Sequence, residues 1–157
     1  MLAFYMIALA VAVVDQTLKS LVRLYLEVGQ SAELWNGAVL LTHYENSGAA
    51  RSSFQGYGTV FMIIGLVVIA GLLVARRRGH IEGTLLTVAT AVLLGGAAGN
   101  TIDRMLFGKV TDYLVAGDGI MNAADLALSA GAGLMLLDTL WRAWRGRGQS
   151  SRHHFTG

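Results

Sequence analysis

Long apolar runs separated by short polar connections dominate this chain. The runs cover about Leu2–Leu26, Gly58–Ala75, Gly83–Ala98 and Ala123–Trp144. A helix needs roughly 20 apolar residues to cross about 30 Å of hydrocarbon, and each run is near that length. The pattern therefore predicts an all-α membrane protein with four transmembrane helices, in one domain over residues 1–144.

The longest polar connection lies between the first two runs, at about residues 28–57. Within it, Ala38–Tyr44 is rich in β-branched and aromatic residues and is flanked by the turn signals Asn36-Gly37 and Asn46-Ser47-Gly48. We expect a small extracytoplasmic β-rich flap here. Residues 145–157 are basic and polar, and are expected to form a disordered cytoplasmic tail.

Composition narrows the class of protein. The chain is 54% hydrophobic and only 14% charged, which is too apolar for a soluble domain of this size. It has no cysteine, which excludes disulfides and thiolate metal sites, and its four histidines are scattered. The basic residues cluster near the ends of the apolar runs, so we expect them to meet lipid headgroups rather than nucleic acid.

The basic residues also predict orientation. Arg76, Arg77 and Arg78 join the second and third runs, and further arginines follow the fourth. With four spans these two regions share one face, which the positive-inside rule makes cytoplasmic. Both termini are therefore expected in the cytoplasm, and the acid-rich connections are expected outside.

Polar residues gather at residues 95–125, around the junction of the last two apolar runs. Carboxylates near a membrane are costly, and their presence there indicates a function. Asp112 opens the connection to the fourth run and Asp125 lies at its start, so a short fold-back would bring them together. Two adjacent carboxylates share a proton, which allows one to activate water while the other donates a proton. Asp125 has a second interpretation, since Asn122 and Asp125 also fit a helix capping box.

Other polar groups have structural as well as functional interpretations. Asp15 and Lys19 are four residues apart on one helix face and can form an ion pair that either orients the helix or supports a site. Asn100, Asp103 and Arg104 fit either a polar site or an interfacial helix end with a snorkelling arginine. Asn46 and Gly48 are compatible with a simple turn. We expect close helix contacts at several glycines: Gly95, Gly96, Gly99, Gly131 and Gly133.

Five motifs occur in a fixed order along the chain. They are Asp15-Gln16-x-x-Lys19, Asn46-x-Gly48-Ala49-Ala50, Gly95-Gly96-Ala97-x-Gly99-Asn100-x-x-Asp103-Arg104, Gly108-x-Val110-x-Asp112-Tyr113 and Asn122-x-Ala124-Asp125. Together, over about residues 10–130, they resemble the lipoprotein signal peptidase family, also called signal peptidase II.

The resemblance implies an aspartyl endopeptidase of the bacterial inner membrane that acts near its outer face. Such enzymes remove signal peptides from diacylglyceryl-modified prolipoproteins, cutting just before the lipidated cysteine of the lipobox. It implies no metal or organic cofactor, and inhibition by globomycin-like cyclic peptides. Asp112 and Asp125 match the catalytic pair. The residues that match substrate-binding or supporting positions are Asn46, Gly48, Asn100, Asp103, Arg104, Asn122, Asp15 and Lys19.

The chain departs from the family pattern at several positions. Leu18 stands where a small hydroxyl residue is usual, and Arg51 and Met121 replace aromatic residues. The connection Leu114–Met121 is short and contains glycine. These departures leave both acids intact and keep open a specialised or non-catalytic paralogue that binds lipidated peptides. Carboxylates buried near a membrane also keep open a proton-coupled transporter subunit.

Overall fold

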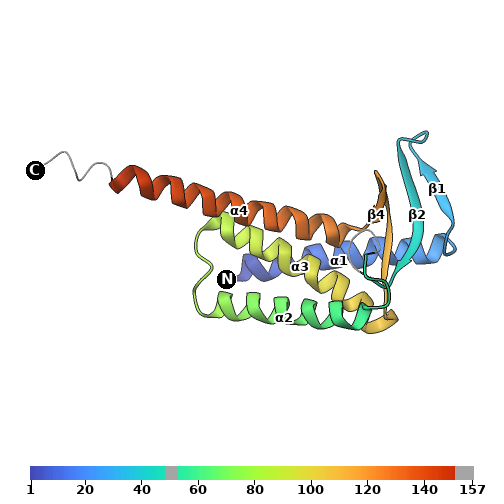
Figure 1. Ribbon diagram of the computed structural model, residues 1–157, viewed down its shortest axis with the longest axis horizontal. Helices are drawn as coiled ribbons and strands as arrows, with labels where there is room; N and C mark the ends of the chain where they lie inside the picture. Colours follow the sequence, from blue (N-terminus) through green and yellow to red (C-terminus); the bar gives the residue numbers. More distant parts are fainter. Residues whose placement is uncertain (49–52, 151–157) are drawn as a thin grey trace, which may run out of the picture.

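Four long helices form a bundle with a small sheet at one end, as Figure 1 shows for the computed structural model, which describes residues 1–48 and 53–150. The helices are α1 (Leu2–Tyr25), α2 (Gly58–Arg77), α3 (Thr84–Phe107) and α4 (Ala123–Ser150). All four are long and apolar enough to cross a membrane. The expected four-span fold is confirmed.

The sheet is larger than expected and draws on a second part of the chain. Its antiparallel strands follow the order β1 (Ser31–Leu34), β2 (Val39–Asn46), β3 (Val110–Ala116) and β4 (Gly119–Met121). The prediction confined the sheet to about residues 28–57, and this was wrong, since half of its strands come from residues 110–121. The segment treated as a loop forms a hairpin because its β-branched and aromatic residues flank the tight turn at Gly117 and Asp118.

Two helices extend beyond their predicted ends. The third apolar run was expected to end near Ala98, but α3 continues to Phe107, because the polar residues of its last turns face the protein interior. Helix α4 continues to Ser150, past the predicted start of the tail at residue 145. The rest of that tail, residues 151–157, and the motif residues Ala49, Ala50 and Arg51 lie outside the described residues.

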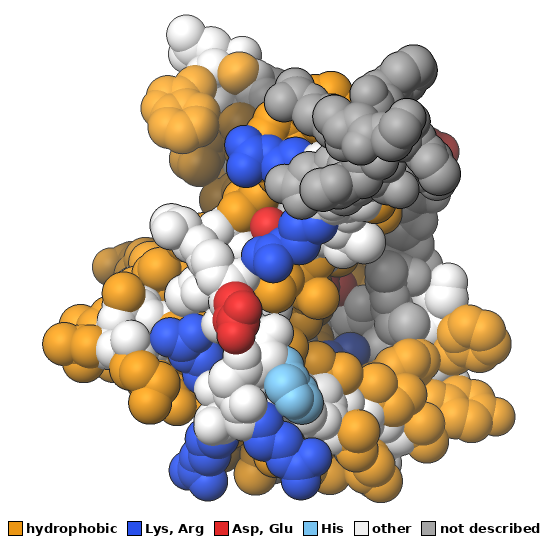
Figure 2. Space-filling view, turned by 90° about the vertical axis from the view of Figure 1, so that its left-hand side faces the viewer, with side chains coloured by type: hydrophobic (Ala, Val, Ile, Leu, Met, Phe, Trp, Pro, Cys, Tyr) orange, Lys and Arg blue, Asp and Glu red, His pale blue; other side chains and the backbone are white. Residues whose placement is uncertain are grey.

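The end of the bundle opposite the sheet is rich in arginine. The connection between α2 and α3 lies there (Figure 1), and Figure 2 shows Lys and Arg side chains spread over this face. Arg142 of α4 bonds the carbonyl oxygen of Glu82 at 2.6 Å and the carboxylate of Asp138 at 2.6 Å. Arg76 donates to the carbonyl oxygen of Ile81 at 2.9 Å. These bonds fix the connection to α2 and α4.

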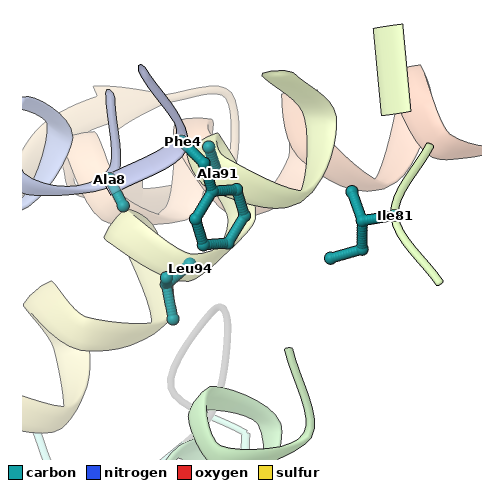
Figure 3. Packing of buried hydrophobic residues seen from close by; sticks show 5 residues of the cluster. All are labelled: Phe4, Ala8, Ile81, Ala91 and Leu94. Carbon is teal, nitrogen blue, oxygen red and sulfur yellow. The ribbon is translucent and has the colours of Figure 1, made fainter. Parts of the chain in front are cut away.

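Helix α3 lies at the centre of the bundle and contains most of its buried helical residues. A buried apolar cluster joins α1, α3 and the α2–α3 connection (Figure 3); its members are Phe4, Ala8, Ile81, Ala91 and Leu94. Glycines allow the backbones to approach: a Cβ at Gly95 would lie 2.6 Å from the carbonyl oxygen of Ala8, and one at Gly96 would lie 2.7 Å from that of Ala124. Gly133 is an exception, since a Cβ added there would have no atom of another described residue within 4 Å, so the expected contact there is wrong.

Candidate active site

The polar side chains predicted from the motifs come together where the bundle meets the sheet. Helix α1 supplies Asp15 and Lys19, and α3 supplies Asn100, Asp103 and Arg104. Asn46 ends β2, Asp112 lies in β3, and Asn122 and Asp125 lie at the start of α4. Asp112 lies within β3, which pairs with β2 in a register that sets Asp112 opposite Tyr44.

Asp112 is almost fully enclosed and holds an amide on each oxygen. Its side chain is 2% exposed. Nδ2 of Asn122 donates to Oδ1 at 2.6 Å, and Nδ2 of Asn46 donates to Oδ2 at 2.8 Å. Burial, with the nearby charge of Asp125 adding to it, raises the pKa of Asp112 to about 6, although the two amides act in the opposite direction.

Asp125 is held in a matching way. Its Oδ1 accepts from Nδ2 of Asn100 at 2.8 Å, and its Oδ2 accepts from the backbone N–H of Asn122 at 3.2 Å. The Asp125 N–H in turn donates to Oδ1 of Asn122 at 3.0 Å. This reciprocal pair is the predicted capping box. Because the same Asn122 also donates to Asp112, the capping residue joins the two acids.

Each of the three amides is fixed in one orientation. The carbonyl oxygen of Asn46 accepts from the Gly48 N–H at 2.9 Å, and that of Asn100 accepts from Nζ of Lys19 at 2.8 Å. That of Asn122 accepts from the Asp125 N–H. With every carbonyl oxygen occupied, the amino groups must face the carboxylates. The site therefore presents donors to both acids.

An ion-pair network between α1 and α3 supports the acids and amides of the site. Lys19 and Asp15 are both fully buried, with Nζ 2.7 Å from Oδ2, and Lys19 also lies 3.6 Å from Asp103. Oδ1 of Asp15 accepts from the Ala124 N–H at 2.8 Å, and Oδ2 of Asp103 accepts from the Thr111 N–H at 2.9 Å. Asp15 therefore links α1 to the start of α4, and Lys19 links α1 to β3 through Asp103. The Asp15–Lys19 pair thus both orients the first helix and supports the site.

Three residues that contact the site were not predicted as its members: Gln16, Arg23 and Thr111. Nε2 of Gln16 donates to Oδ1 of Asp103 at 3.0 Å and to the Gly99 carbonyl oxygen at 2.9 Å. Arg23 donates to Oγ1 of Thr111 at 2.9 Å. The spacing of Arg23, four residues after Lys19, was the available signal, because both then share one helix face.

Arg104 connects the site to the segment after β2. Its Nη2 donates to the Gly48 carbonyl oxygen at 2.8 Å, and its guanidinium carbon lies 5.7 Å from the ring centroid of Phe61. The Arg104 charge acts on both acids, and Arg104 lines one cavity with Asp125, but among the described residues it forms no direct ion pair with either acid. The snorkelling alternative is not supported, since Arg104 bonds protein backbone.

Asp125 borders two cavities, one on each side. The first, about 280 Å³, lies between α2, α3 and α4. Its lining includes the polar Asn100, Arg104 and Asp125 and the apolar Ile64, Val68 and Leu128. The second, about 290 Å³, lies between β4 and α4. Within the described residues, no group of three His, Asp or Glu side chains could hold a metal ion. Because both cavities meet at Asp125, the arrangement is suited to acid–base chemistry on a molecule that passes this acid.

Comparison with known proteins agrees with this geometry. The model of the signal peptidase (SPase) II family matches residues 7–141. The chain belongs to the signal peptidase II family. It is 39% identical over 140 residues to the lipoprotein signal peptidase of Listeria monocytogenes serotype 4b (strain CLIP80459), covering 85% of this chain and 90% of that protein.

A second relative and a solved structure agree. The lipoprotein signal peptidase of Halalkalibacterium halodurans is 34% identical over 139 residues, covering 85% of this chain and 89% of its own. The solved structure of a bacterial membrane enzyme superposes with a TM-score of 0.83 at 29% identity, covering 91% of this chain and 90% of that one. The resemblance drawn from the motifs is confirmed, and membership supports a protease that removes signal peptides from prolipoproteins.

Proposed function

We propose that this protein is an aspartyl endopeptidase of the bacterial inner membrane. It removes the signal peptide from diacylglyceryl-modified prolipoproteins by cutting just before the lipidated cysteine of the lipobox. The observation that carries the proposal is the bridging of Asp112 and Asp125 by one asparagine, Asn122, beside two cavities. The family membership supports the substrate class.

In the proposed reaction, one carboxylate takes a proton from water, and the oxygen of that water attacks the carbonyl carbon of the residue before the cysteine. The partner acid protonates the leaving amine as the C–N bond breaks. The products are a signal peptide with a free carboxylate and a lipidated cysteine with a free α-amino group. The raised pKa of Asp112 favours this residue as the partner that holds the proton. Asn100 and Arg104 border the first cavity and can bind substrate backbone.

The proposed orientation places both termini in the cytoplasm and the site near the outer face. It rests on the arginine-rich face in Figure 2, which the positive-inside rule assigns to the cytoplasm. The substrate's signal helix and acyl chains then enter sideways from membrane lipids, while water reaches the acids from outside. Globomycin-like peptides are expected to compete at the acids.

A specialised or non-catalytic paralogue that binds lipidated peptides is the alternative, motivated by the departures at Leu18, Arg51 and Met121. The retention of both acids with all three amide donors favours the peptidase. The transporter alternative is disfavoured because the buried carboxylates beside the sheet belong to one network rather than to a path along the helices.

Cleavage of a diacylglyceryl-modified prolipoprotein by the purified protein in lipid tests the proposal. We expect Asp112→Asn and Asp125→Asn each to abolish cleavage, and globomycin to block it. Asp118→Asn serves as a matched control, because Asp118 is an exposed acid at the tip of the β3–β4 hairpin. A folded wild type that binds the substrate without cutting it would establish the binding paralogue instead.

A further inference from the structure

Strand β4 is the outer strand of the sheet on the side of the acids. The strand order is β1-β2-β3-β4, and within the described residues no strand pairs with the far side of β4. Its residues, Gly119–Met121, lead directly into Asn122 and so to Asp125. A free strand edge presents unpaired N–H and C=O groups.

The register identifies which backbone groups point outward. Ala116 pairs with Gly119 across a two-residue turn, and Gly117 has a φ of 57°, as the first central residue of a type II′ hairpin requires. The residues that flank such a turn bond each other, and the next pair does not, because the two kinds of pair alternate. The next pair is Val115 and Ile120. The N–H and C=O of Ile120 therefore face the free edge.

The second cavity beside Asp125 runs along this same edge. All three residues of β4 line it, together with Asp125, Leu126, Leu128 and Ser129 of α4. Side chains of consecutive strand residues point to opposite faces, so a space that touches three in a row lies beside the strand. The backbone edge and the carboxylate thus border one mostly apolar space of about 290 Å³.

We propose that the free edge of β4 binds the substrate backbone by strand addition. This role rests on the proposed function. It assigns the β4 edge to an extended, uncharged stretch of the substrate next to the bond that is cut. The N–H and C=O of Ile120 bond this stretch, and an apolar side chain of the substrate fills the cavity. Strand addition fixes the peptide by main-chain hydrogen bonds and leaves side-chain choice to the pocket. The bond to be cut is thereby held beside Asp125.

Removing one backbone donor tests this site. Ile120→Pro deletes the N–H, and proline is tolerated where a strand's N–H faces away from the sheet. Ile120→Val is the matched control, because it shortens the side chain and keeps the N–H. In an Asp112→Asn background, which leaves the substrate uncut, we expect Ile120→Pro to weaken binding of a fluorescent diacylglyceryl lipopeptide about three- to tenfold relative to Ile120→Val. Equal thermal unfolding midpoints would show that both variants are folded.

A second measurement changes the substrate and leaves the protein intact. Lipopeptides in which one amide is replaced by an ester lack one N–H, and the ester that removes the partner of the Ile120 carbonyl should weaken binding by a similar factor. Strand addition would be overturned if Ile120→Pro and Ile120→Val bound the lipopeptide equally. It would also be overturned if every ester peptide bound as tightly as its amide parent. Cleavage by the wild type is measured separately. If the protein binds the lipopeptide through Ile120 but does not cut it, the peptidase proposal is overturned and the binding site at β4 stands.

Discussion

Lys19 sets the orientation of Asn100. Its ammonium donates to the Asn100 carbonyl oxygen at 2.8 Å, and the amino group at the other end of the amide then donates to Asp125 at 2.8 Å. An amide without the lysine could rotate and present its oxygen to the carboxylate, which would repel it. A side chain on the first helix thus controls a hydrogen bond at the start of the fourth.

Lys19→Met is expected to cause a large loss of stability together with loss of cleavage. The variant leaves the buried carboxylates of Asp15 and Asp103 without their buried cation, and breaking a buried pair costs about 3–5 kcal/mol. Thermal unfolding in detergent measures the effect. Arg23→Met is the control, because Arg23 also lies 3.5 Å from Asp103 but is 24% exposed, so its loss should cost much less. Equal losses in the two variants would contradict this account.

The two roles of Asn122 can be separated by substitution. Asn122→Ser keeps an oxygen that can cap α4 but lacks the amino group that bonds Asp112, while Asn122→Ala lacks both. We expect both variants to lose cleavage. Only the alanine variant should also lose the cap, which is worth about 1 kcal/mol in unfolding free energy. If the serine variant cleaved normally, the Asn122 amide would have no part in the reaction.

Much of this arrangement was predictable because it depends on local spacing. The four spans follow from run length, the Asp15–Lys19 pair from its separation of four residues, and the capping box from Asn122 and Asp125. The approach of Asp112 to the start of α4 was also predicted, from the short connection between them. In each case the interacting groups lie on one element or on neighbouring elements.

The strands of residues 110–121 and the contacts between distant parts of the chain were harder to predict. Leu114–Met121 was treated as a loop, and β3 was not predicted, because β3 is stabilised by pairing with β2, more than sixty residues earlier, and β4 has only three residues. The register that places Asp112 opposite Tyr44 depends on that pairing and has no local signal. The role of Gln16 was missed for the same reason, since its partners lie on α3.

Gly99→Ala should disrupt the support of the site. A Cβ at this position would lie 2.4 Å from Oδ2 of Asp15, which cannot retreat easily because Lys19 and the Ala124 N–H hold that carboxylate. We expect a loss of about 1–3 kcal/mol in unfolding free energy and a strong fall in cleavage. Gly133→Ala is the matched control: the position is helical and open, so alanine should stabilise the helix by about 0.5–1 kcal/mol. A tolerated Gly99→Ala would show that Asp15 can move without effect on the acids.

Asp112 should make the stability of the protein fall with rising pH. Because burial raises its pKa from 3.8 to about 6, the folded state binds more protons than the unfolded state between these values. The unfolding free energy therefore decreases as pH rises through this window, by about 3 kcal/mol in all, and changes no further above it. Unfolding midpoints measured from pH 4 to pH 8 should show this decrease in the wild type and in Asp118→Asn, whose substituted acid is exposed. Asp112→Asn should lack that part of the decrease, and an unchanged slope in this variant would assign the proton to another group.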